Sequence, residues 1–237
     1  MTKNNDIVIL KNLNNDLKKY KVKLIFQYYD VCPFKESKIE ILEVVLRYVD
    51  LLSNIYNRIF ILSSLCDKYY KDCIPVLIKI YHIFIEKFYK VPQDEMYLLY
   101  ICNTIAKINA LEYTYLYEGI ISRPMTQSAE PIIEMLSKFN IEKFEPIIFN
   151  LIKKENLIPK AWLGELNEDS KYWCSLVALK CIVNEKDNKY LDFFEELIDD
   201  QDMNWIKFTD SKYANKLTID LKNKYKSLAK KGINKIK

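Results

Sequence analysis

Glycine, proline and histidine are scarce in this chain of 237 residues, which has 3, 7 and 1 of them. All-β folds need many turns, and turns are built largely from glycine, proline and asparagine. The shortage therefore favours long helices joined by short connections. The three glycines are scattered along the chain and cannot form a glycine-rich phosphate loop.

The six cysteines contain no C-x-x-C pair, although Cys66 and Cys73 are seven residues apart, as are Cys174 and Cys181. In a reducing compartment, cysteine on an apolar helix face behaves as a small hydrophobic residue. His82 has no second histidine beside it in a zinc motif. The sequence therefore predicts no metal and no cofactor.

Strong charge of one sign and long apolar runs are also missing. The net charge of +4 comes from 36 basic and 32 acidic residues, whereas an obligate nucleic-acid binder would have a large basic excess. No uncharged apolar run reaches the roughly 18 residues of a membrane span. The start, MTKNNDIVIL, lacks the pattern of a signal peptide. We expect a cytoplasmic protein without a membrane partner.

The chain is instead rich in amphipathic helices. Apolar residues recur at offsets 0, +3, +4, +7 and +8, which is the period of one helix face. Four segments with this template begin at Ile74, Tyr113, Phe144 and Tyr190, and His82 takes the last position of the first one. The position favours a packed, hydrogen-bonded core or boundary histidine. The segments are 39, 31 and 46 residues apart, and each follows another helical pattern. Half of the chain is hydrophobic, enough for a sizeable core.

These patterns predict four helix pairs in a single domain that spans residues 1–237. Pro75, Pro131 and Pro146 are expected in first turns, where a missing N–H costs little. Asn156–Glu168 interrupts the pattern. The first helix is expected over Asp6–Tyr29, a capping box at Ser37–Glu40 precedes the second, and Ser53 is expected to cap the third. The predicted ranges are 6–52 for the N-terminal helices, 54–89, 94–122, 129–154 and 169–199 for the pairs, and 210–231 for a C-terminal capping helix.

Antiparallel pairs with apolar residues at matching offsets resemble HEAT-like or armadillo-like repeats of the α-solenoid class. The resemblance covers about residues 54–200, rests on register and not on a signature motif, and implies an all-α superhelix of HEAT-like antiparallel helix pairs. The alternative is an irregular all-α globule. The chain is also similar in length and repeats to HEAT-like DNA glycosylases, which use tryptophans and an aspartate on a basic concave face. Trp162, Trp173, Trp205 and Asp169 are present, but no Trp-Asp pair or basic row accompanies them.

Candidate binding residues lie at template offsets +2 and +5 of the second helices, outside the buried stripe. Tyr115 and Phe149 would be exposed interface aromatics, or would pack against neighbouring turns. Residues 185–202 carry eight acids against two lysines, whereas 207–237 carry ten lysines against two acids. This contrast indicates either that the solvated faces of the two segments attract each other, or that the segments steer a charged partner. The predicted partner-binding residues are Lys79, Tyr115, Glu118, Phe149, Asp192, Glu195, Glu196 and Asp199.

HEAT-like folds often present extended surfaces to protein partners, so the resemblance implies non-catalytic binding of another protein, with the acidic residues favouring a basic one. The abundance of lysine, asparagine, isoleucine and tyrosine is typical of AT-rich bacterial genomes, where small helical-repeat proteins include immunity factors for secreted toxins. The alternatives are a nucleic-acid-binding HEAT-like protein and an enzyme built around His82 or paired carboxylates such as Glu195-Glu196. The oligomeric state stays open.

Overall fold

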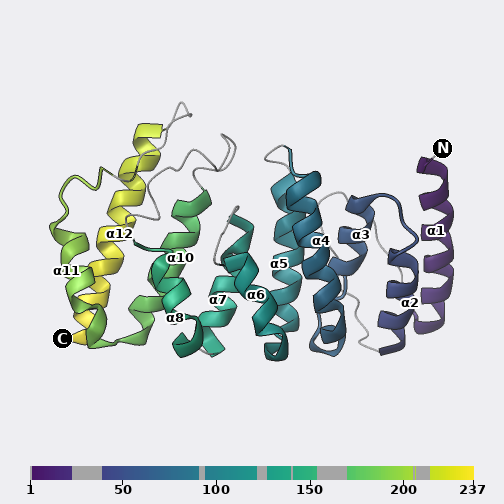
Figure 1. The fold of residues 1–237 in the computed structure, drawn as a ribbon, viewed down its shortest axis with the longest axis horizontal. Coiled ribbons are helices and arrows are strands. Elements are labelled where there is room, and N and C mark those ends of the chain that lie inside the picture. The colour runs from purple at the N-terminus through teal and green to yellow at the C-terminus, as the bar shows by residue number, and fades with distance from the viewer. Residues whose placement is uncertain are drawn as a thin grey trace. The chain divides into compact units, whose positions relative to one another are not determined.

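The computed structural model describes residues 2–22, 39–90, 94–121, 127–139, 141–153, 170–204, 206 and 214–237. All regular elements in these ranges are helices, so the all-α prediction is confirmed (Figure 1). Contacts divide the chain into two compact units, Met1–Gly119 and Ile120–Lys237, and each is described by itself. The single domain stays a prediction.

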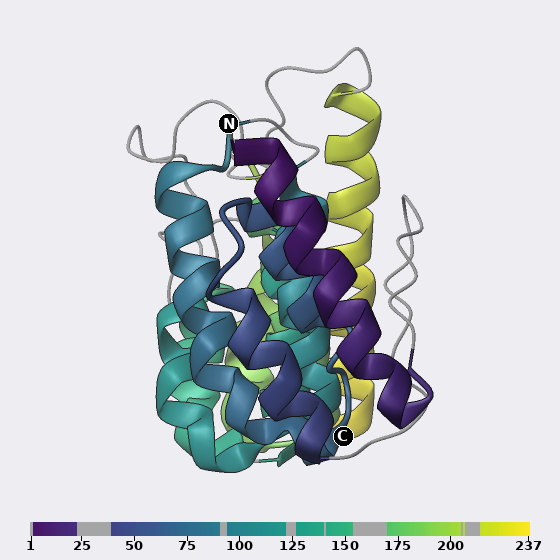
Figure 2. The same cartoon turned by 90° about the vertical axis from the view of Figure 1, so that its right-hand side faces the viewer.

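Unit 1 is a row of helices in which each packs on the next. The helix α1 packs on α2, α2 on α3, α3 on α4 and α4 on α5, and α3 also contacts α5. Figure 2 shows α1 as the front helix of this unit. The short 3₁₀ helices η2 (Lys68–Cys73) and η4 (Leu111–Tyr113) precede α4 and α6. The helices are α1 (Thr2–Leu17), α2 (Ile39–Val49), α3 (Ile55–Ser63), α4 (Ile74–Lys87), α5 (Glu95–Ile108) and α6 (Thr114–Ile121), whose last two residues belong to unit 2.

The first helix is shorter than the predicted span of Asp6–Tyr29. After α1, the 3₁₀ helix η1 (Lys18–Tyr20) leads to Lys21, whose φ of 58° is left-handed. The Val22 amide donates to the Leu17 carbonyl at 3.2 Å, a bond that closes a helix C-terminus. The prediction is wrong because apolar spacing does not report this local backbone reversal. The capping box at Ser37 lies outside the described residues.

The start of α3 is also capped differently from the prediction. The Asn54 side chain is the cap and accepts the Tyr56 amide at 2.9 Å. Ser53 instead donates its amide (2.9 Å) and hydroxyl (2.8 Å) to the Asp6 carboxylate, which the Asn54 amide also reaches at 2.9 Å. Burial raises the pKa of Asp6, but these donors outweigh it and hold the pKa below its ordinary value. A buried carboxylate of α1 thus secures the start of α3.

Unit 2 contains α7 (Glu130–Phe139), α8 (Ile141–Asn150), α10 (Ser170–Glu185), α11 (Leu191–Asp199) and α12 (Ala214–Ile236), with the 3₁₀ helices η5 (Gln127–Ala129) and η7 (Asn188–Tyr190). The helix α7 packs on α8 and α10, and α12 packs on both α10 and α11. The interruption at Asn156–Glu168 lies outside the described residues. Two described α-helices lie within each predicted pair range, and the division of the chain into repeats stays a prediction.

The predicted proline positions hold for two of three helices. Pro75 and Pro131 are the second residues of α4 and α7. Pro146 is the sixth residue of α8, because this helix already begins at Ile141. The prediction of a first-turn proline is therefore wrong for Pro146, whose ring removes an amide from the helix interior.

The apolar template is buried or half-buried at all of its positions except His82. The exposed His82 lies beside α6 at Gly119, where a β-carbon would be 3.6 Å from the imidazole. The predicted packed core or boundary histidine is therefore wrong, because the residue of α6 that lies beside the ring is a glycine.

The helices α11 and α12 approach each other closely at Gly232. A β-carbon built on Gly232 would lie 2.5 Å from Cε2 of Phe194, a ring that is 1% exposed. Such a distance is far shorter than van der Waals contact. The absence of a side chain at this position therefore allows the ring of α11 to lie directly against the backbone of α12.

Candidate protein-interaction surfaces

The predicted site residues of unit 1 lie on two neighbouring helices. At their starts, the Lys71 ammonium is 2.8 Å from Glu112, and the Tyr113 hydroxyl donates to Asp72 at 3.1 Å. Near their ends, His82 of α4 lies beside Gly119 of α6. The two helices therefore run side by side in the same direction.

Lys79 lies one turn before His82 on α4, and Tyr115 lies one turn before Gly119 on α6, whereas Glu118 directly precedes Gly119. Lys79, Tyr115 and Glu118 are all exposed, and Tyr115 has 64% of its surface accessible. Two further apolar side chains are exposed on the preceding 3₁₀ helices: Tyr69, at 57%, and Leu111, at 40%.

Sequence reasoning missed Tyr69 and Leu111. Both precede the apolar template and lie in 3₁₀ helices of a few residues, where helical periodicity carries no information. Lys71 of η2 and Glu112 of η4, which lie within two residues of Tyr69 and Leu111 in sequence, form an ion pair at 2.8 Å. The hydrogen bond to Glu112 raises the pKa of Lys71, and the bond from Lys71 lowers the pKa of Glu112. This exposed ion pair stays charged at neutral pH and positions the two segments, although such pairs stabilise little.

Phe149 is less accessible than Tyr115, although both residues occupy template offsets outside the buried stripe. Phe149 is half-buried and contacts the rings of Tyr190 and Phe193, with centroids 5.7 and 5.2 Å away. The Lys189 ammonium bonds Glu145 of α8 at 2.7 Å. Phe149 thus joins α8 to the segment around α11, which favours the packing alternative for this residue.

The four predicted acids of unit 2 are exposed on α11. Part of their charge is compensated locally, because Glu195 lies 3.3 Å from the Lys237 ammonium. Lys222 and Lys226 of α12 donate to the backbone carbonyls of Asp202 and Gln201. Attraction between the two oppositely charged helices thus accounts for part of the charge contrast. The acids are Asp192, Glu195, Glu196 and Asp199.

A groove of about 350 Å³ lies between α10 and α12. Trp173 is half-buried at its edge, and the Lys224 ammonium lies 5.0 Å from the indole centroid. The Tyr225 hydroxyl donates to the Tyr172 carbonyl, and Lys235 donates to Asn184. These contacts at successive levels show that α10 and α12 run in the same direction. The groove is lined by Glu130, Trp173, Leu176, Val177, Lys180, Lys224, Ser227 and Leu228.

Three cysteines of the described residues are unsuited to act as nucleophiles. Burial raises the pKa of the Cys73 thiol to about 12, and also raises the pKa of Cys66 and Cys181. These thiols are protonated at neutral pH and are poor nucleophiles. Within the described ranges, no group of three or more histidine, cysteine or acidic side chains is suited to hold a metal ion. Trp162, Trp205 and Asp169, named for the glycosylase resemblance, lie outside the described residues.

Comparison with known proteins gives no match, whether with protein-family models, curated proteins or solved structures. None of the helices in the described residues combines the length and apolar content that a membrane span requires. The function therefore has to be inferred from the surfaces of the two units.

Proposed function

We propose that this chain is a HEAT-like helical-repeat protein that binds another protein without catalysing a reaction. The first helices of successive pairs pack on one another within each unit: α3 on α5 in unit 1, and α7 on α10 in unit 2. In unit 2, α12 continues the series by packing on α10 in the same direction. This order of contacts is typical of stacked helix pairs.

The stacking has a direct consequence for binding. The second helices α4, α6 and α11 each carry exposed side chains outside the buried stripe. At template offsets +2 and +5 of these helices, Lys79, Tyr115, Asp192 and Glu195 are exposed, whereas Phe149 of α8 is half-buried. A repeat protein of this kind offers the accessible side of its second helices to a partner.

The accessibility of Tyr115 is the observation that carries the proposal. The Tyr115 ring has 64% of its surface exposed, and Tyr69 and Leu111 of the preceding 3₁₀ helices are exposed as well. Tyrosine is enriched among interface residues that dominate binding energy, because its ring buries a large area at a low entropy cost. Lys79 and Glu118 supply the polar rim.

A partner that is basic overall fits the rest of the surface. Asp192, Glu196 and Asp199 are exposed on α11, and opposite charge on the partner accelerates association. Such a surface suits a stoichiometric inhibitor in the cytoplasm, similar in role to bacterial immunity proteins. In this role Tyr115 is the anchor and the acids of α11 steer the encounter.

The experiment begins with affinity purification of the full chain from cells of its source, followed by calorimetric titration with the recovered stoichiometric protein. Tyr115→Ala should weaken this binding about thirtyfold or more, as expected for loss of a residue that contributes about 2 kcal/mol. The double variant Tyr115→Ala/Glu118→Ala should weaken it further.

Ile219→Ala is the matched control, because Ile219 is also 58% exposed but lies on α12. It should leave the affinity within a factor of two or so of the parent chain. Recovery of no stoichiometric protein, or full affinity in the Tyr115 variants, would refute the proposal.

A further inference from the structure

The groove of unit 2 is built from two parallel helices with a helical register on each wall. From α10 it takes Trp173, Leu176, Val177 and Lys180, at offsets 0, +3, +4 and +7. From α12 it takes Lys224, Ser227 and Leu228, at offsets 0, +3 and +4. The groove therefore follows both helix axes over about two turns of α10, and is not a closed cavity between loops.

The floor of the groove is apolar. Leu176 and Val177 are each 4% exposed, and half-buried Leu228 faces them from the α12 side. Trp173 forms the wall at one end of the row. Side chains of a ligand that enter this space would contact aliphatic and aromatic carbon, and would gain free energy by leaving water.

The edges of the groove are basic. Lys180 and Lys224 are both exposed, and neither forms an ion pair with a carboxylate of the described residues. The position of the Lys224 ammonium over the Trp173 ring holds its charge at the groove edge. Glu130, at the start of α7, is the acid among the lining residues.

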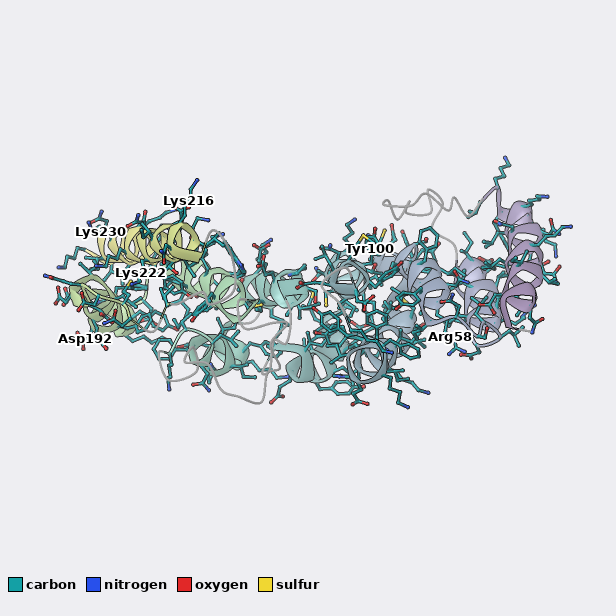
Figure 3. All side chains as sticks on the ribbon, turned by 90° about the horizontal axis from the view of Figure 1, so that it is seen from above. Arg58, Tyr100, Asp192, Lys216, Lys222 and Lys230 are labelled. Atoms are coloured by element: carbon teal, nitrogen blue, oxygen red, sulfur yellow. The ribbon has the colours of Figure 1, made fainter. Side chains whose placement is uncertain are left out.

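The lysines of α12 differ in their surroundings. Three lysines interact with α11 or with the segment that follows it. Lys222 and Lys226 donate hydrogen bonds to backbone carbonyls, and Lys237, directly after α12, forms an ion pair with Glu195. Lys216 and Lys230 extend into solvent, on the opposite side of the helix pair from Asp192 (Figure 3). The positive charge that α11 leaves uncompensated therefore lies on the outer side of α12, and it reinforces the charge of the groove edges.

We propose that the α10–α12 groove binds an acidic, amphipathic helical segment of a partner protein. Apolar side chains at helical spacing would occupy the floor, and flanking carboxylates would pair with Lys180 and Lys224. Helices commonly dock in this way through anchors at i, i+3, i+4 and i+7. The groove volume of about 350 Å³ is sufficient for such anchors. This site lies on a different unit from Tyr115 and selects the opposite charge from the acids of α11.

The test uses the full chain and a synthetic, fluorescein-labelled peptide of about 15 residues, long enough to form a helix when bound. Its leucines stand at i, i+3, i+4 and i+7, and glutamates flank them. A matched peptide has lysine at every glutamate position. Fluorescence anisotropy should show the acidic peptide binding at least about tenfold more tightly than the basic one, because the groove edges repel lysine.

Single variants locate the binding in the groove. Lys224→Gln should weaken binding of the acidic peptide about three- to fivefold, whereas Lys230→Gln removes the same charge from the same helix and should change it less. Ser227→Glu places a like charge among the anchors and should weaken it by about tenfold or more. All three residues are exposed, so the fold is expected to persist, and circular dichroism of each variant checks this.

The proposal is overturned if the acidic peptide does not bind at millimolar concentration, if both peptides bind equally, or if Lys224→Gln and Lys230→Gln act alike. Binding of an oligothymidylate that Lys224→Gln weakens, without binding of the acidic peptide, also overturns it in favour of a nucleic acid. Tyr115→Ala should leave the peptide affinity unchanged, so failure here is distinguishable from failure of the proposed function.

Discussion

Substitution of Gly232 by alanine tests the close approach of α11 and α12 directly. The added β-carbon would lie 2.5, 2.7 and 2.8 Å from three ring carbons of Phe194. The ring cannot simply turn away, because it is buried and its centroid lies 6.3 Å from that of Tyr190 and 5.9 Å from that of Phe193. The methyl group therefore has to move either a packed aromatic cluster or the helix itself.

Two opposing effects determine how Gly232→Ala changes the free energy of unfolding. Alanine is favoured over glycine within a helix by about 1 kcal/mol, which would stabilise the variant. Overpacking of a filled core costs about 1–3 kcal/mol. We expect overpacking to outweigh helix propensity, because the contact is far inside van der Waals distance. Gly232→Ala should therefore lower the free energy of unfolding of unit 2 by up to about 2 kcal/mol.

Gly119→Ala is the matched control. This glycine also lies within a helix, but its β-carbon would be 3.6 Å from the His82 ring, an ordinary contact. The alanine should therefore raise stability by about 0.5–1 kcal/mol, which is the propensity effect alone. The two substitutions are chemically identical and should have opposite signs.

Urea titration followed by tryptophan fluorescence is the appropriate assay for unit 2. All three tryptophans of the chain, Trp162, Trp173 and Trp205, belong to this unit, so their emission reports its unfolding. Far-UV circular dichroism follows both units and serves for Gly119→Ala. Gly232→Ala should lower the urea midpoint without changing the slope.

A double-mutant cycle with Phe194→Leu identifies the cause. If the ring is the obstacle, Phe194→Leu should cost less stability when combined with Gly232→Ala than in the parent chain, with a coupling of about 1 kcal/mol. A higher midpoint in Gly232→Ala, or strictly additive effects of the two substitutions, would show that the ring does not oppose a side chain at this position.

Further expectations concern buried polar groups and thiols. Asp6→Asn should destabilise unit 1 by about 1–3 kcal/mol in urea titrations at pH 7, because it weakens the acceptor of the amides that start α3. The pKa of Asp6 is lowered in the folded state, so its carboxylate contributes to the free energy of unfolding above its ordinary pKa of about 3.9, and this contribution is lost as the pH falls through the folded pKa. The stabilities of the parent chain and of Asp6→Asn should therefore converge in acid. A difference in stability that stays constant with pH would contradict this. Thr104→Val should cost about 1 kcal/mol, because the buried hydroxyl of α5 bonds the Ser63 carbonyl at 3.1 Å; equal urea midpoints would contradict this. At pH 8, iodoacetamide should label half-buried Cys66 before Cys73, whose pKa is about 12, and mass spectrometry of tryptic peptides would show the reverse order if burial were not decisive.

Much of the helical layout could be predicted from local patterns. The repeated template located α4, α6, α8 and α11, because burial of one helix stripe leaves a periodic trace in the sequence itself. The end of α1 could not be located in this way. It depends on the left-handed conformation of Lys21, and lysine carries no signal for that geometry. The hydrogen bonds from Ser53 to Asp6 were missed because the two residues are far apart in sequence.

The candidate sites were predictable only in part. The offsets outside the stripe correctly indicated exposure of Lys79 and Tyr115, but they treated Phe149 as the equivalent of Tyr115. Phe149 is half-buried because η7 and α11 place two rings against it. The groove beside Trp173 left no sequence signal, since its two walls come from helices about fifty residues apart, such as those that Tyr172 and Tyr225 join.

The sequence by itself determined that the protein is helical, where most of its helices lie and which stripe of each is buried, because these properties depend on residues within one or two turns of each other. The tertiary structure alone decided which side chains outside the stripe stay accessible. That outcome depends on which helix lies alongside and what it presents there: a glycine beside His82, two rings beside Phe149, and solvent beside Tyr115.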